Sequence, residues 1–193
     1  VEKLNPAQPL ISGDGTREET SVEPVYSYQK YYNKQEVVNR GVNMIVDDVA
    51  QIKCNVGPKL DSVTPLVSGM RAVQLTRLLN KEPNPFQDIN SFRRSLVLDF
   101  VIDGNIFIYW DGAHMYHLPA TRMKVVGDKN TYVSHYEFDG QQKFKYNEVI
   151  HIKDNSYQTV YRGASRLKPA LRTMKILLSM REFQDNFFKN GAV

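Results

Sequence analysis

The sequence predicts an α+β fold, with amphipathic helices packed on a mainly antiparallel β-meander and a long helix at the C-terminal end. Three observations predict it. Apolar residues recur at helical spacing up to about residue 103, the spacing becomes strand-like between residues 105 and 153, and helical spacing returns after residue 165. A chain of 193 residues can bury one sizeable core.

The first 32 residues are expected to form an extended or mobile arm, which leaves residues 33–193 as the folded domain. Up to residue 25 prolines and glycines are frequent and bulky apolar residues are few, so little burial can offset the entropy of ordering. A tyrosine cluster follows, and it either forms an interface or covers the domain's own core. Its members are Tyr26, Tyr28, Tyr31 and Tyr32.

The first predicted helix begins with a capping-box-like pattern at Asn33 and Glu36 and stops at Gly57. Its apolar residues recur at a 4-3-4-3 spacing, which is typical of an amphipathic helix. These residues are Val38, Val42, Ile45, Val49 and Ile52.

Two further helices are predicted before the strands. A short one covers residues 72–79, and Pro83 and Pro85 prevent it from continuing. Asp88 is suited to cap the next helix, which includes Phe92 on its apolar face and ends at Gly104.

The strand-like region is rich in aromatic and β-branched residues. Asp111-Gly112 is a two-residue hairpin signal between residues 105–110 and 113–118. A second hairpin joins residues 123–126 to 132–138, and short strands over 143–146 and 149–153 complete the predicted meander.

The last predicted helix has Ser165 as its N-cap and Gly191 as the residue that ends it. Leucine and methionine residues at a 4-3-4 spacing form its inner face: Leu167, Leu171, Met174 and Leu178. Its opposite face carries three basic residues, which either contact a neighbouring subunit or are solvated: Arg172, Lys175 and Arg181.

Composition and motifs argue against several functional classes. The net charge of +4 is spread along the chain, which disfavours tight DNA binding. No apolar run approaches the ~20 residues of a membrane span, and no phosphate-binding or dinucleotide-binding motif occurs. No cofactor and no catalytic residue are expected.

The histidines are the nearest approach to a metal site. His114 and His117 are three residues apart, which on a strand places them on opposite faces. His151 follows Glu148 at the spacing of di-iron helical motifs, but the segment reads as a strand and the motif occurs once. A metal-dependent hydrolase is therefore the least favoured interpretation.

Short motifs follow one another in a fixed order. A Pro-Asn-Pro-Phe run precedes one helix, a Gly-Asn-aromatic sequence enters the first strand, and a Val-Ile-His-Ile segment precedes a loop. A Gly-Ala-Ser sequence opens the last helix, and Asn-Gly ends it. The residues concerned are Pro83, Asn84, Pro85, Phe92, Gly104, Asn105, His151, Gly163, Ser165, Phe187, Asn190 and Gly191.

This order resembles the portal proteins of tailed bacteriophages of the HK97-like type. The resemblance implies a wing-like domain of a structural subunit in a ring, expected to be dodecameric, at one capsid vertex. Double-stranded DNA would pass through the ring during packaging and ejection. The implied partners are identical subunits, the major capsid protein, the terminase and a head-completion protein, with no membrane. The stem, clip and crown are expected beyond Val193, in a longer parent protein.

An alternative interpretation is a small binding module. Aromatic and basic residues alternate over residues 26–34, a pattern that could stack single-stranded nucleic acid or hold a peptide.

Overall fold

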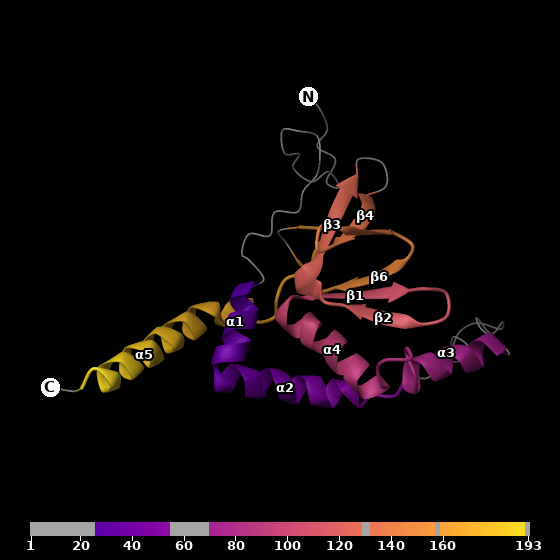
Figure 1. Cartoon of the computed structure of the whole chain (residues 1–193). Helices are drawn as coiled ribbons and strands as arrows, with labels where there is room; N and C mark the ends of the chain where they lie inside the picture. Colours follow the sequence, from indigo (N-terminus) through magenta and orange to yellow (C-terminus); the bar gives the residue numbers. More distant parts are fainter. Residues whose placement is uncertain (1–25, 55–69, 129–131, 157–158, 192–193) are drawn as a thin grey trace, which may run out of the picture.

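The computed structural model describes residues 26–54, 70–128, 132–156 and 159–191 (Figure 1). In these ranges the chain forms five α-helices, six strands and two short 3-10 turns, so the predicted α+β class is confirmed. The helices are α1 (Tyr26–Lys34), α2 (Glu36–Ala50), α3 (Met70–Asn80), α4 (Ile89–Ile102) and α5 (Leu171–Lys189). The strands are β1 (Asn105–Trp110), β2 (Met115–Leu118), β3 (Met123–Asp128), β4 (Tyr132–Phe138), β5 (Gln142–Lys145) and β6 (Val149–Lys153).

The strands form two antiparallel sheets, in the orders β2-β1-β6 and β3-β4-β5. The predicted meander therefore holds for β3 to β5, whereas β6 pairs with β1, from which it is separated by four other strands in sequence. Burial explains this pairing, because the Phe107 ring of β1 is fully buried and stacks on His151 of β6. The core between the sheets consists of Phe107, Ala120, Met123, Val125, Tyr136, Phe144, Val149 and Tyr161.

The predicted helix cap at Asp88 is confirmed, and the predicted turn at Asp111 is present as a longer loop. Asp88 caps α4 by accepting hydrogen bonds from the backbone N–H groups of Asn90 and Ser91. The Asp111 turn is longer than two residues, because its carboxylate accepts from the N–H groups of Ala113 and His114 and holds residues 111–114 as a loop.

The helical core corrects the expected boundary of the arm. Residues 26–32 form most of α1, and Tyr28 and Tyr31 are buried against α2, α4 and α5. These two side chains cover the chain's own core, so they are not available to another subunit. Residues 1–25 and the side chain of Tyr26 lie outside the described residues. Tyr32 is partly buried and donates a hydrogen bond to Asn43.

Gln35 separates the predicted first helix, α2, from α1, a helix that was not predicted from the sequence. This residue has an extended conformation, so α2 begins at Glu36 rather than at a capping box on Asn33. Its buried side chain donates a hydrogen bond to the carbonyl of Met174, which ties the α1–α2 corner to α5. The helix ends at Ala50, and the expected stop at Gly57 lies outside the described residues.

The long last helix begins later than predicted. Lys168–Ala170 form a 3-10 turn around Pro169, and α5 starts at Leu171. Ser165 accepts a hydrogen bond from the N–H of Leu167, so it caps the turn that precedes the helix. The predicted inner face is confirmed by the burial of Leu171, Met174 and Leu178. Gly191, at φ +70°, follows the helix end as expected.

Candidate functional site

Four of the motif residues meet at one buried junction. Gly104 and Asn105 join α4 to β1, His151 lies on β6, and Gly163 lies in the loop before α5. The N–H of Gly163 donates to Oδ1 of Asn105 at 2.7 Å, and Nε2 of His151 lies 3.1 Å from the same oxygen. Asn105 is fully buried, so its amide joins three distant segments.

The Asn105 amide also fixes the protonation of His151. Its nitrogen donates to Oδ1 of Asp103 at 2.5 Å, so its oxygen is the acceptor for both Gly163 and His151. Nε2 of His151 therefore carries the hydrogen. Burial is the main cause that lowers the pKa of His151 to about 3, and the nearby charges of Lys153 and Arg162 contribute to the same shift. The imidazole is neutral at physiological pH.

An ion pair that the motifs did not reveal completes the junction. Arg162 and Asp103 are 59 residues apart and both buried, with Nη2 of Arg162 2.5 Å from Oδ1 of Asp103. The guanidinium also donates to the carbonyls of Met123 and Ala120 at 2.6 and 3.1 Å. Burial raises the pKa of the Asp103 carboxyl, against the lowering effect of Arg162.

The neutral His151 gives the junction a measurable pH dependence. The unfolded chain binds a proton on this histidine below about pH 6.5, whereas the folded chain does so only near pH 3. We therefore expect the free energy of unfolding to fall with decreasing pH in this window, by up to about 1.4 kcal/mol per pH unit from this residue. Urea unfolding of His151→Gln at several pH values should show a shallower decline.

The matched control for that measurement is His114→Gln, at a half-exposed histidine in the β1–β2 loop. The control should retain the slope of the unchanged protein. Equal slopes for His151→Gln and the unchanged protein would contradict the assignment of a neutral, buried imidazole.

A second group of motif residues holds the start of α4 against β2. The side-chain nitrogen of Asn84 donates to the carbonyl of Met115, and the N–H of Met115 donates to the carbonyl of Pro83. Phe92 packs with Ile108 and Met115 in a small core. Asn84 and the prolines beside it thus set the angle at which the chain enters α4.

The histidines considered as metal ligands are not brought together. His114 pairs with Asp111, His117 contacts the Asp99 carboxylate at 2.8 Å, and His151 lies in the junction. Within the described residues no group of three or more potential ligands is arranged to hold a metal ion. Asp99 also accepts from the N–H of Ala120, so both of its contacts are structural.

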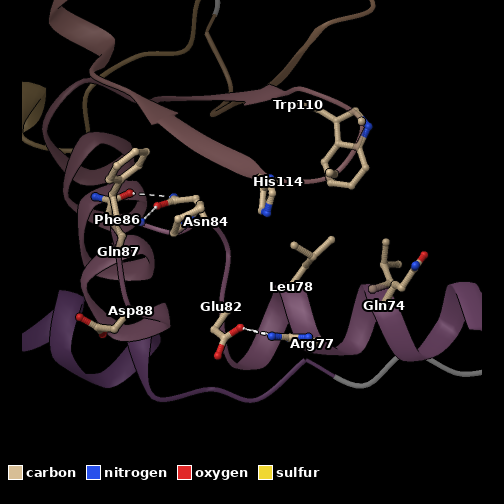
Figure 2. A pocket seen from close by; sticks show the side chains of 14 residues that line it. Gln74, Arg77, Leu78, Glu82, Asn84, Phe86, Gln87, Asp88, Trp110 and His114 are labelled. Carbon is tan, nitrogen blue, oxygen red and sulfur yellow. Dashed lines mark hydrogen bonds and ion pairs between the residues drawn. The ribbon is translucent and has the colours of Figure 1, made fainter.

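A groove of about 930 Å³ lies between α3, the loop before α4 and the β1–β2 loop. Figure 2 shows Trp110 and His114 on one side and Gln74 and Leu78 of α3 on the other. Its charged side chains include the Arg77–Glu82 ion pair, and among the described residues that line it there is no serine or cysteine.

Apolar side chains are exposed on several helices. Among the described residues, α5 exposes Ile176, Leu177, Met180, Phe183, Phe187 and Phe188, and α2 with the residues after it exposes Val37, Met44, Ile45, Val49 and Ile52. The last three were expected on the buried face of α2, but Val42, Val46 and Ala50 occupy it. Arg172, Lys175 and Arg181 are exposed on α5. None of the described helices is long and apolar enough to cross a bilayer.

Known proteins match the chain along most of its length. Residues 36–193 match the family described as phage portal protein. The portal protein of Escherichia phage T5 is 37% identical over 198 residues, which cover all of this chain and 49% of that protein. The portal protein of Enterobacteria phage HK97 is 28% identical over 127 residues, covering 61% of this chain and 29% of that protein.

Solved structures share the fold. A chain in the virion of the native gene transfer agent particle superposes with a TM-score of 0.75 at 16% identity, over 92% of this chain and 48% of that one. A chain in the neck of the native particle, computed with C12 symmetry, gives a TM-score of 0.74 at 18% identity, over 94% and 49%.

The chain spans about half the length of the phage T5 relative and less of the HK97 one. The family match covers the helical core except α1, both sheets and the junction of Asp103, Asn105, His151, Arg162 and Gly163. This chain belongs to the phage portal protein family.

Proposed function

We propose that this chain is the wing part of a portal subunit, which assembles with identical copies into a ring at the capsid vertex. The ring would form part of the conduit for double-stranded DNA during packaging and ejection and part of the head–tail connection. The observation that carries the proposal is the exposure of large apolar side chains on α2 and α5 of a chain in this family. Such surfaces mark protein–protein contacts.

The symmetry of a solved relative supports a ring of twelve. One structural neighbour lies in a neck computed with C12 symmetry. A closed ring requires heterologous contacts, in which two different surfaces of the subunit meet. We further propose that the ring binds the major capsid protein, the terminase and a head-completion protein, and that the chain has no catalytic role.

The alternative function was a small module that binds single-stranded nucleic acid or peptide. The fold removes its main support, which was the aromatic cluster of residues 26–34. Stacking of bases needs accessible aromatic faces. Tyr28 and Tyr31 are buried in the helical core, so the aromatic cluster of residues 26–34 cannot present them.

The test of the proposed function uses the full-length gene product. Its mass in solution should equal a multiple of the subunit mass, and negative-stain microscopy should show a ring with a central hole. A stable monomer at high protein concentration would overturn the proposal.

The three basic residues of α5 provide a prediction of their own. Arg172, Lys175 and Arg181 are exposed, so replacing all three with glutamine should leave the circular dichroism spectrum and thermal midpoint unchanged. If they pair with acidic groups of a neighbouring subunit, ring formation should need a higher protein concentration and depend less on salt. Ring formation at unchanged concentration would show that these side chains are only solvated.

A further inference from the structure

Helix α5 has apolar residues on two opposite faces. Leu171, Met174 and Leu178 are buried in the helical core. At 100° per residue, a second row lies on the other side of the helix and continues to its far end. This α5 stripe consists of Ile176, Met180, Phe183 and Phe187, each about half exposed or more. None of the described residues of the wing covers this second face.

The α5 stripe has the spacing of a helix–helix seam. Its residues are separated by four, three and four positions, as the a and d positions of a coiled coil are. The rings of Phe183 and Phe187 stack with centroids 6.4 Å apart, so the stripe is continuous towards the helix end. A second helix with a complementary row is the partner that this spacing fits.

Helix α2 carries a matching flank. Gly41, Ile45 and Asp48, with Ile52 just after the helix end, follow the same four-three-four spacing, and Val49 borders them. Ile45 and Ile52 are about half exposed. Each row spans twelve residues, which in α5 correspond to about 16 Å of helix.

Gly41 indicates that another backbone or ring approaches this flank closely. Glycine within a helix is unfavourable relative to alanine, so its presence calls for a packing reason. The described residues of its own chain offer none, because a Cβ at this position would meet none of their atoms within 4 Å. An aromatic ring from outside would fit against the bare backbone.

Charge selects α2 over α3 as the partner of α5. Helix α5 has four basic and two acidic residues, whereas α2 has three acidic and one basic. Of the acidic residues of α2, Asp47 pairs with Arg94 of its own chain, and Asp48 lies in the flank and is exposed. Helix α3, which also exposes apolar residues, has two arginines and no acidic residue and would repel α5. Figure 1 shows α5 extending away from the body at one end, with α2 running the other way from α1.

We propose that the α5 stripe of one subunit packs on the α2 flank of the next subunit in the ring. This inference rests on the proposed function and names the two surfaces of its heterologous contact. Because the two rows differ, each copy uses its α5 stripe on one side and its α2 flank on the other, which permits a closed ring.

Crosslinking of two differently tagged, full-length variants tests the pairing. Cys54 and any other native cysteine are replaced by serine, and one protein carries Phe183→Cys while the other carries Ile45→Cys. After mixing and reassembly, a short bismaleimide crosslinker should join the two tags to each other. Crosslinks only between copies of Phe183→Cys would show that α5 packs on α5, and would overturn the proposal.

Charged substitutions provide the matched comparison. Phe187→Glu lies in the α5 stripe, whereas Phe188→Glu, on a residue that is also exposed, points about 100° away. Phe187→Glu should raise the protein concentration needed for ring formation at least about tenfold, because the contact would bury an unpaired carboxylate. Equal effects of the two variants would overturn the proposal.

The Gly41→Leu variant distinguishes an effect on ring assembly from an effect on folding of the subunit. Leucine has a higher helix propensity than glycine and the site is open, so the thermal midpoint of the subunit should be unchanged or higher. Ring formation should nevertheless weaken by about tenfold, since the side chain would occupy the space of the partner. If both Gly41→Leu and Phe187→Glu form rings as well as the unchanged protein does, this pairing is overturned and the proposed function is left intact. If the unchanged protein forms no rings, the proposed function itself is overturned.

Discussion

Gly163→Ala is expected to lower the free energy of unfolding by several kcal/mol, on the order of 3–5 kcal/mol. A Cβ at Gly163 would lie 2.1 Å from the carbonyl oxygen of Gly104 and 2.6 Å from the backbone nitrogen of Asp154. Both atoms belong to the backbone and are hydrogen-bonded to each other, so no side-chain rotation relieves the overlap. Guanidinium unfolding followed by circular dichroism measures the loss.

Gly140→Ala is the matched control for this prediction. Gly140 lies at φ +68° in a turn, and a Cβ there would meet no atom within 4 Å. Its replacement should cost only the strain of the left-handed conformation, about 1 kcal/mol. If Gly163→Ala costs no more than Gly140→Ala, the loop before α5 can move away from Gly104 and does not fix the junction.

Local signals in the sequence predicted the elements of the fold well. Asp88 and Gly104 mark the two ends of α4, and the helical spacing of the apolar residues from Leu171 to Leu178 identifies the buried face of α5. Each of these signals depends on residues close together in sequence, such as a cap, a turn or a helical repeat. Interactions between neighbouring residues are therefore sufficient to interpret these signals.

Pairings between distant residues were the part that the sequence did not reveal. The Gly-Asn motif, His151 and Gly163 were each identified from their order, but their meeting at Asn105 depends on the pairing of β6 with β1. Arg162 precedes the motif residue Gly163, but nothing in the sequence indicates that it pairs with Asp103. A charged residue in a sequence does not show by itself whether it is buried.

The exposed apolar faces show a related limit. The sequence places Ile45, Val49 and Ile52 on the same apolar face as Val42, but the structure buries Val42 and leaves the other three exposed. Spacing alone does not show which apolar side chains the chain itself covers. In the same way, the tyrosines at 28 and 31 fit an interface or a core equally well in the sequence, and only the packing of α1 decides between them.

Arg162→Met is expected to destabilise the fold by about 3–5 kcal/mol, because it removes one partner of a buried ion pair and leaves the other uncompensated. The carbonyls of Met123 and Ala120 would also lose their donor in a buried site. Arg122→Met is the matched control: its pair with Asp139 is exposed, so its loss should cost less than about 1 kcal/mol.

The double variant Arg162→Met, Asp103→Leu tests whether the cost of Arg162→Met comes from the stranded charge. Burial already raises the pKa of Asp103 with the guanidinium beside it, so its carboxylate is unfavourable in this site once the arginine is gone. Removing both charges should therefore recover at least about 1 kcal/mol relative to Arg162→Met alone. Unfolding free energies of the four proteins in this cycle give the coupling. A double variant as unstable as the sum of the single ones would mean that the arginine stabilises the junction through the carbonyls of Met123 and Ala120 rather than through Asp103.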